Sequence, residues 1–510
     1  MTVYNVNLGI GWASSGVEYA QKYRNDIFKR INIDAKFIFS DLILANNIEA
    51  LTHNMGFDDQ EIIWLYNFFT DVKIAPCSYT LNKLEKDLDL NNKEHTKTFV
   101  NQQVVYELKN EQLTIVVRLA DKRKEILDQV TYMRNNKLLK RDFYSYTKYA
   151  CEYYVGTADN YVVNREFYNE NGSVAYTQYL DKGKEMFEFP NQIIFYSKSD
   201  LYREMLKRLN LGQNDQIIID RIDEDKNLIN GQIILENHGA AKIFVVVHAD
   251  HYSKEFTNQH HILWNNYYEY QFNNSSEIDT YIVATPMQKK ILAKQLKQYY
   301  GINARIICIP VGNLAKLTAP DPQLKRYSLI TASRLASEKH IDWIIQAVVK
   351  AKKMIPELSF DIYGEGNKKA ALQELINTNQ AQDYIKLKGQ QDLSKVYSKY
   401  DGYIAASTSE GFGLSLMEAV GSGLPMIGYD VPYGNPTFID NNKNGFLLPY
   451  NNDWSSDKKI SILSEAIVKL FTKDNHEMVE FRKHSYEIAQ NYLLDKIATK
   501  WQKELEPNND

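Results

Sequence analysis

The chain alternates between short apolar runs and amphipathic patterns of helical spacing over two long stretches. Residues 242–248 form a continuous apolar run that ends in His248, which is typical of a parallel strand buried on both faces. Helical patterns with a period near 3.6 residues occupy residues 286–300 and 414–420. Because strands and helices alternate regularly over about 150 residues of the C-terminal half, that half predicts a doubly wound parallel sheet. The N-terminal half repeats the pattern more coarsely, so we expect an α/β protein.

The pattern changes between residues 72 and 190. Short β-branched and aromatic runs alternate with polar residues and are separated by turn signals, which predicts an antiparallel meander. The runs expected as strands are residues 102–108, 113–118, 150–155, 160–167 and 174–179, and the turn signals include Asn135-Asn136 and Gly156–Asp159. We interpret the segment as an inserted β domain. Its aromatic residues fit either a binding platform or the plain covering of a two-faced sheet, and the basic residues 137–141 fit a solvated sheet edge.

The length of 510 residues exceeds what one hydrophobic core supports, so several domains are expected. Residues 310–322 carry three prolines and are the best linker candidate. The predicted division is a first Rossmann-like domain (1–72 with 191–312), the inserted β domain (73–190), a second Rossmann-like domain (313–485), and a C-terminal helix (486–510) that returns to the first.

Composition and charge narrow the function classes. A hydrophobic share of 44% with 24% charged residues indicates a soluble globular protein, and the net charge of −4 offers no electrostatic case for nucleic acid. Three widely spaced cysteines argue against a disulfide framework and a zinc site, and fit a reducing cytoplasm. We expect no signal peptide, and no apolar stretch reaches the ~18–20 residues of a membrane span.

Candidate chemistry centres on residues 401–425. A short strand, a glycine-rich turn with Glu410 and a helix from about Leu414 follow one another, so free N–H groups and the helix dipole can hold phosphate. Carboxylates at Glu410 and Glu418 can bind hydroxyl groups, which together suits a nucleotide-sugar. An ordinary turn with surface glutamates is the alternative. A glycine-rich turn at residues 9–16 and His248 at a strand end are weaker candidates.

With these residues identified, the chain resembles the family 4 retaining glycosyltransferases of GT-B fold, in which two Rossmann-like domains face a cleft. The C-terminal half carries the motifs of that resemblance, which are Arg334 with Lys339, the glycine loop Asp361–Gly366, the pair Glu410 and Glu418 eight residues apart, and Gly421–Pro425. The β insertion in the N-terminal half and the segment Gly9–Ala20 resemble, more narrowly, the catalytic A subunits of accessory-secretion glycosyltransferase pairs.

The resemblance implies a role for each motif. Arg334 and Lys339 would stabilise the leaving diphosphate, Glu410 would face the sugar, and His248 would bind a sugar hydroxyl; these four are the implied catalytic residues. Glu418, about 7 Å along its helix from the turn, would bind the ribose, and residues 389–391 the uracil. The implied donor-binding residues are Gly16, Val17, Glu18, Tyr19, Gly389, Gln390, Gln391, Glu410, Gly411, Phe412, Gly413, Leu414 and Glu418.

The same resemblance implies a reaction and partners. We expect transfer of N-acetylglucosamine from UDP-N-acetylglucosamine to Ser/Thr hydroxyls of a serine-rich repeat adhesin, without a cofactor or metal. A noncatalytic homologous subunit would bind through the β domain. The complex would lie in the cytoplasm, peripheral to the inner face of the cell membrane. Glucose as donor sugar stays open. So do two other functions: a teichoic-acid α-glycosyltransferase of the same fold, and a noncatalytic substrate-binding partner, against which the intact Glu410, Glu418, Arg334 and Lys339 count.

Overall fold

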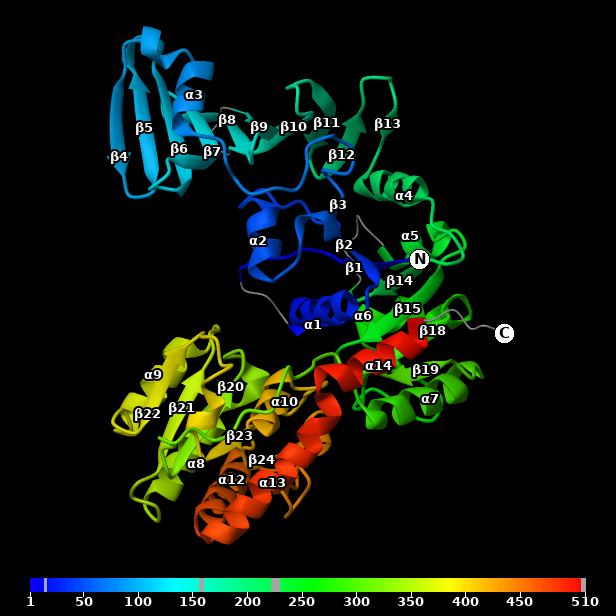
Figure 1. Ribbon diagram of the computed structural model, residues 1–510, viewed down its shortest axis with the longest axis vertical. Coiled ribbons are helices and arrows are strands. Elements are labelled where there is room, and N and C mark those ends of the chain that lie inside the picture. The colour runs from blue at the N-terminus through cyan, green and yellow to red at the C-terminus, as the bar shows by residue number, and fades with distance from the viewer. Residues whose placement is uncertain (13–15, 156–159, 222–229, 506–510) are drawn as a thin grey trace. The chain divides into compact units, whose positions relative to one another are not determined.

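A computed structural model describes residues 1–12, 16–155, 160–221 and 230–505, and its strands and helices are shown in Figure 1. The described strands form two parallel sheets, one long antiparallel sheet and a two-stranded ribbon, as an α/β protein with an inserted β domain requires. Contacts divide the chain into two compact units. The first comprises Met1–Asn25, Ile33–Val245 and Ser276–Asp279, and the second comprises Asp26–Asn32, Val246–Ser275 and Thr280–Asp510.

The first parallel sheet has the strand order β19-β18-β15-β14-β1-β2-β3. Its strands are β1 (Thr2–Asn7), β2 (Asp34–Phe39), β3 (Ile62–Trp64), β14 (Gln216–Ile219), β15 (Lys242–Val247), β18 (Thr280–Val283) and β19 (Ile306–Cys308). The helices of this part of the chain are α1 (Gly16–Arg30), α2 (Ile48–Asn54), α4 (Lys198–Leu209), α5 (Asn230–Asn237), α6 (Asn266–Asn273) and α7 (Pro286–Tyr300). The residues between Phe39 and about Phe69 carry two patterns of helical spacing that predict helices, and this expectation is wrong at β3, which pairs in parallel with β2.

Helix α7 shows how local sequence sets these elements. The Thr285 side chain accepts from the Gln288 amide at the start, and Pro286 occupies the first turn, where it loses no hydrogen bond. Gly301 ends the helix in the left-handed conformation at φ 70°. The observed bounds are those predicted from the sequence.

The antiparallel sheet contains ten strands in the order β13-β12-β11-β10-β9-β8-β7-β6-β5-β4. They are β4 (Thr96–Val100), β5 (Gln103–Leu108), β6 (Leu113–Asp121), β7 (Ile126–Arg134), β8 (Lys137–Tyr144), β9 (Lys148–Tyr154), β10 (Val162–Tyr168), β11 (Val174–Asp181), β12 (Lys184–Glu188) and β13 (Ile194–Phe195). Helix α3 (Leu81–Asp87) covers one face through Leu81 and Leu84, which join a core with Val104 and Tyr106 (Figure 1).

Three features of this part of the chain were predicted from the sequence. Asn135 and Asn136 have positive φ and turn β7 into β8, as predicted. The basic residues 137–141 were expected at an edge, but β8 pairs with β7 and β9 and is an interior strand. Within this run, Lys140 pairs with Asp142 at 3.0 Å. The turn expected at Gly156–Asp159 lies outside the described residues.

The second parallel sheet has the order β22-β21-β20-β23-β24-β25. Its strands are β20 (Ser328–Ala332), β21 (Ser359–Tyr363), β22 (Ile385–Gly389), β23 (Gly402–Ile404), β24 (Met426–Tyr429) and β25 (Gly445–Leu448), with helices α8 (Ile341–Lys352), α9 (Lys369–Thr378), α10 (Leu414–Gly421) and α11 (Asn435–Phe438) between them. The ribbon pairs β16 (Tyr252–Ser253) with β17 (Leu263–Trp264). Every residue of β20 is buried, which matches its interior place in the sheet.

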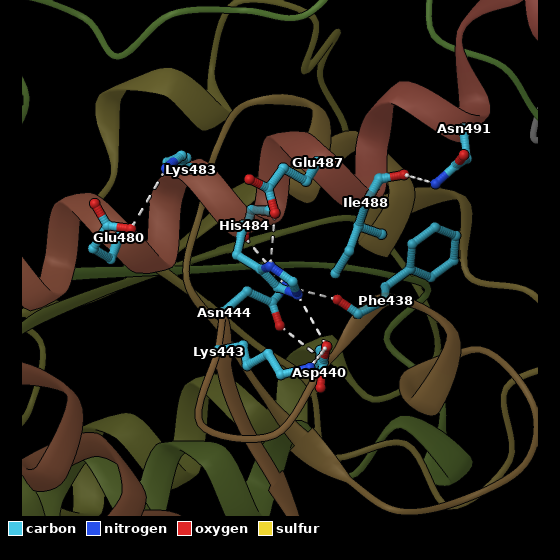
Figure 2. A network of polar contacts seen from close by, with 11 residues as sticks. Phe438, Asp440, Lys443, Asn444, Glu480, Lys483, His484, Glu487, Ile488 and Asn491 are labelled. Atoms are coloured by element: carbon cyan, nitrogen blue, oxygen red, sulfur yellow. Dashed lines mark hydrogen bonds and ion pairs between the residues drawn. The ribbon is translucent and has the colours of Figure 1, made fainter.

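Three helices end the described chain: α12 (Ser456–Phe471), α13 (Asn475–Ala489) and α14 (Leu494–Leu505). Figure 2 shows how α13 is tied to the turn before β25, where His484 contacts Asp440 at 3.0 Å and Glu487 at 2.9 Å. Within the second unit, Trp501 of α14 packs edge-on against Phe28 with ring centroids 5.2 Å apart. No helix in the described residues combines the length and apolar character needed to cross a membrane.

Candidate functional site

The loop after β20 carries the predicted basic pair, and a glycine loop after β21 supports its backbone. Residues 333–335 and 363–365 are joined by two amide-to-carbonyl bonds of 3.1 and 2.9 Å. At Gly364, which has φ 127°, an added Cβ would lie 1.9 Å from the Ser333 carbonyl oxygen. The predicted glycine motif therefore acts by allowing close approach of the Arg334 loop.

The predicted site residues Lys339 and Glu410 form an ion pair. Lys339 Nζ lies 2.7 Å from Glu410 Oε2, and the two side chains are only 14% and 20% exposed. The loops that carry them are also joined directly, since the Thr408 amide donates to the Glu338 carbonyl at 3.1 Å. A charge-assisted hydrogen bond with limited water access fixes both groups in place.

Arg334 lies on the same loop but faces outward. Its side chain is 73% exposed and contacts Glu338 Oε1 at 3.2 Å. An exposed pair of this kind contributes little to stability, so the guanidinium can exchange Glu338 for a better anion.

The start of α10 is shaped by Gly413, which precedes Leu414 with φ 86°. The Phe412 side chain is buried and packs against Phe438, so only its backbone is free to face a ligand. Farther along α10, the Tyr397 hydroxyl donates to Glu418 Oε2 at 3.0 Å. The helix thus presents backbone N–H groups at its start and a carboxylate one to two turns later.

His248 follows β15 directly and belongs to the second unit, as Glu410 does. An added Cβ at Gly411 would lie 2.4 Å from the His248 carbonyl oxygen, so the two loops are in backbone contact. The Tyr268 hydroxyl accepts from the amides of His248 and Ala249, at 2.9 and 3.1 Å. The structure therefore brings the His248 and Glu410 loops together.

Two residues after His248, Asp250 contacts the turn that carries Glu410. Its Oδ2 accepts a hydrogen bond from the Ser409 hydroxyl. Burial, together with the neighbouring Glu410 charge, raises the pKa of the Asp250 carboxyl, against the opposing effects of Ser409 and Lys339. Four polar groups from three loops therefore interact electrostatically: Asp250, Ser409, Glu410 and Lys339.

His251 extends this contact through an aromatic cluster. Its Nδ1 lies 3.2 Å from the Tyr433 hydroxyl, and its Nε2 lies 2.7 Å from Gln295 Oε1. The Tyr433 amide in turn donates to the Glu410 carbonyl at 2.6 Å. Burial lowers the pKa of His251 to about 4, so this imidazole is neutral near pH 7.

The predicted uracil segment begins at Gly389, which has φ 72° and whose carbonyl accepts from the Gly364 amide at 2.9 Å. Gln390 and Gln391 are exposed. The segment therefore adjoins the glycine loop that supports Arg334.

The predicted N-terminal residues Gly16–Tyr19 begin α1, while residues 13–15 of the same turn lie outside the described residues. The Glu18 side chain is only 6% exposed, accepts from Asn7 Nδ2 at 3.1 Å and lies 3.8 Å from Arg221. It belongs to a buried polar network of the first unit, together with Gln21. What faces solvent at this helix start is Gly16 and Tyr19.

Sequence reasoning missed Asp250, Ser409, His251 and Tyr433. Asp250 had one usable signal, because a carboxylate just after a buried parallel strand lies where open α/β sheets bind ligands. Tyr433 had none, since its contact depends on how two distant loops fold. In the described residues, no cluster of three or more His, Cys, Asp or Glu side chains is arranged to hold a metal ion.

Comparisons with known proteins identify the family of the chain. The family model described as "Glycosyl transferases group 1" matches residues 318–481, and that of the "GtfA extended beta-sheet domain" matches residues 94–191. The second match covers most of the predicted β insertion.

Three relatives resemble nearly the whole chain. A UDP-N-acetylglucosamine--peptide N-acetylglucosaminyltransferase GtfA subunit of Limosilactobacillus reuteri subsp. suis is 56% identical over 506 residues, which is 98% of each chain. The crystal structure of the pneumococcal O-GlcNAc transferase GtfA in complex with UDP and GlcNAc has a TM-score of 0.93 at 44% identity, covering 99% of this chain and 98% of that one. A structure of a GtfA/B complex has a TM-score of 0.91 at 46% identity, covering 99% of both.

These matches confirm the resemblance and the GT-B fold predicted from the sequence motifs. Identity of this level over almost the full length of both chains is sufficient to assign a family. The chain belongs to the family of GtfA subunits of UDP-N-acetylglucosamine--peptide N-acetylglucosaminyltransferases.

Proposed function

We propose that this protein is the catalytic subunit of a two-protein complex that transfers N-acetylglucosamine from UDP-N-acetylglucosamine to Ser/Thr hydroxyls of a serine-rich repeat adhesin, with retention at the anomeric carbon. The observation that carries the proposal is the Lys339–Glu410 pair beside α10, in a chain 56% identical to a peptide N-acetylglucosaminyltransferase subunit. The same identity favours a protein acceptor over teichoic acid. The presence of Glu410, Glu418, Arg334 and Lys339 argues against a role limited to binding the substrate.

The chemistry explains why this arrangement suits the reaction. The bond between C1 and the β-phosphate oxygen breaks with its electron pair leaving on UDP, a bond between C1 and the acceptor oxygen forms, and the hydroxyl proton passes to the departing phosphate oxygen. Negative charge grows on UDP while positive charge grows at C1, so preorganised positive groups near the diphosphate lower the barrier. Lys339 supplies positive charge, and the N–H groups at Gly413 and Leu414 supply the positive end of a helix. The exposed guanidinium of Arg334 adds a charged group that can donate two hydrogen bonds at once.

In the proposed site, donor binding changes the partner of Lys339. The diphosphate competes with Glu410 for the ammonium, and Glu410, held by its backbone, is then available to the sugar hydroxyls. Glu418 binds the ribose and residues 389–391 border the uracil. His248 binds a sugar hydroxyl, and the N–H groups at the start of α1, in residues 16–19, add contacts to the diphosphate.

We also propose that transfer needs no divalent ion, because cationic side chains take over charge neutralisation at the diphosphate. The measurement is the transfer rate with excess EDTA, which we expect to equal the untreated rate. A loss that added Mg²⁺ or Mn²⁺ restores would contradict this.

The partner and location follow from the β domain and the family. A relative forms a GtfA/B complex, which supports a partner subunit for this chain. We propose that this noncatalytic subunit binds through the ten-stranded sheet. The complex works in the cytoplasm and associates peripherally with the inner face of the cell membrane, as part of accessory secretion.

The deciding experiment incubates the protein with its candidate partner, a serine-rich peptide and either UDP-N-acetylglucosamine or UDP-glucose. We expect a mass increase of one N-acetylhexosamine per modified residue. NMR analysis of the anomeric proton of the product should report the α-linkage. A parallel reaction offers polyglycerol phosphate as acceptor. Sugar transfer to that polymer, with none to the peptide, would contradict the proposal.

A further inference from the structure

Asp250 lies on a segment whose backbone is fixed from both sides. Its carbonyl accepts from Asn265 Nδ2 at 3.1 Å, and the preceding Ala249 carbonyl accepts from Gln288 Nε2 at 2.9 Å. The following residue, His251, is fully buried. The carboxylate of Asp250 therefore extends from a rigid base.

The turn that receives this carboxylate is held by backbone hydrogen bonds on both sides of Glu410. The Glu410 carbonyl accepts from the amides of Tyr433 and Gly434, at 2.6 and 2.8 Å. On the side that precedes Glu410, the Thr408 amide donates to the Glu338 carbonyl at 3.1 Å, and the Ser407 hydroxyl lies 3.5 Å from Glu410 Oε2. The Ser409 hydroxyl donates to Asp250, and this bond joins the side chain next to Glu410 to the His248 loop.

We propose that Asp250 is a positioning residue for transfer: its carboxylate, through the Ser409 hydroxyl, fixes the Glu410 turn against the His248 loop and so sets Glu410 and Lys339 at their reactive separation. This inference rests on the proposed function, since it assigns Glu410 to the donor sugar. Glu410 is adjacent to Ser409 in the chain and bonded to Lys339 at 2.7 Å, so a displacement of Ser409 is passed on to that pair.

A carboxylate suits this task better than a neutral acceptor. Ionised acceptors form hydrogen bonds about twice as strong as neutral ones. An ionised Asp250 and Lys339 also attract each other electrostatically. Because small displacements of reacting groups can cost up to ~100-fold in rate, a contact that touches no substrate can still control turnover.

The test uses the complex of the full chain with its partner subunit, and five variants: Asp250→Ala, Ser409→Ala, the double variant, Ser409→Thr and Asp250→Asn. Each is assayed for kcat and KM of peptide modification and for the Kd of UDP. Ser197→Ala is the matched control, because Ser197 also donates to an aspartate, Asp200 at 2.8 Å, in the first unit and outside the site.

We expect Asp250→Ala and Ser409→Ala each to lower kcat about 10-fold or more, with the Kd of UDP changed less than about 3-fold. The double variant should be no worse than the weaker single variant, because both remove one hydrogen bond. Ser409→Thr, which keeps the hydroxyl, should restore activity. Asp250→Asn should fall between Asp250→Ala and the wild type.

Several results would overturn the proposal. Losses that multiply in the double variant, a Kd for UDP that rises in parallel with the loss of kcat, or no loss at all would each remove Asp250 from the positioning role. A wild-type complex that modifies no peptide would instead contradict the proposed function, so the two failures are distinguishable.

Discussion

The starts of helices α1 and α10 look alike in sequence, since each follows a short strand and a glycine-containing turn and carries glutamates. Their side chains are held in different ways. Glu18 is almost fully buried and bonded to Asn7, whereas Glu410 is paired with Lys339 beside exposed polar groups. The first glutamate belongs to a structural network of its unit, and the second belongs to a pair that a ligand can rearrange.

Gly16 and Gly411 also differ in how closely other atoms approach them. An added Cβ at Gly16 would meet no atom within 4 Å, while one at Gly411 would collide with the His248 carbonyl oxygen. Gly411 therefore lies where two loops are in close backbone contact, whereas the position of Gly16 would accommodate a side chain. A shared strand–turn–helix pattern therefore does not identify the chemistry of a site, whereas the partners of its carboxylates do.

The largest effect is expected at the Lys339–Glu410 pair. Lys339→Ala removes the positive charge proposed for the diphosphate, and Glu410→Gln removes the carboxylate, so we expect transfer to fall about 100- to 1,000-fold for each. The measurement is kcat/KM for peptide modification. Lys473→Ala is the control, because Lys473 pairs with Glu477 at the same 2.7 Å distance and is 16% exposed, like Lys339. Equal losses in Lys473→Ala would show that only stability had changed.

A smaller loss is expected from Gly411→Ala. The added methyl would lie 2.4 Å from the His248 carbonyl oxygen, so one of the two loops must shift. We expect a loss of about 10- to 100-fold in kcat, since misplacement of a reacting group is costly. In Gly212→Ala, where the nearest atom to the new Cβ is Asp215 Oδ2 at 3.7 Å, activity should stay unchanged. Full activity in Gly411→Ala would show that the contact of the two loops is irrelevant to turnover.

Local pattern was sufficient to predict most of the scaffold. The bounds of α7 follow from its cap, its first-turn proline and its terminal glycine, and the turn at Asn135-Asn136 follows from its tolerance of positive φ. By contrast, β3 contains three residues, which is too short for any period to distinguish it from a helical turn.

Strand order and loop contacts could not be predicted in this way. Residues 137–141 have a basic pattern that suits an edge, yet pairing with β7 and β9 places them in the interior of the sheet. The bond between Asp250 and Ser409 joins residues 159 positions apart in sequence. Such contacts depend on the register of whole sheets, so the motif identified Glu410 and Lys339 but not the residues that hold them.

We expect the buried network of Asn7 and Glu18 to contribute more to the free energy of unfolding than the carboxylate of Glu410 does. Asn7 is fully buried and donates to Glu18 and Gln21 in the first unit. Asn7→Ala leaves buried acceptors without that donor, so we expect a loss of about 1–3 kcal/mol and a Tm lower by several degrees. Glu410→Gln should leave the Tm nearly unchanged. The exposed Asn110, which contacts Glu94 at 3.2 Å, provides the control variant Asn110→Ala. A larger Tm decrease in Glu410→Gln than in Asn7→Ala would reverse the comparison.

The smallest effect concerns pH and His251, which connects Gln295 to Tyr433 and so to the Glu410 carbonyl. Because burial lowers its pKa to about 4, the unfolded chain binds a proton below pH 6.5 that the folded chain does not. Stability therefore falls with decreasing pH, by about 0.7 kcal/mol from this group between pH 7 and pH 6. His251→Gln should be less stable than the wild type at pH 7, and the difference in Tm should narrow at pH 6. All other histidines are present in both proteins, so a difference in Tm that stays constant between the two pH values would show that His251 does not titrate below its ordinary range.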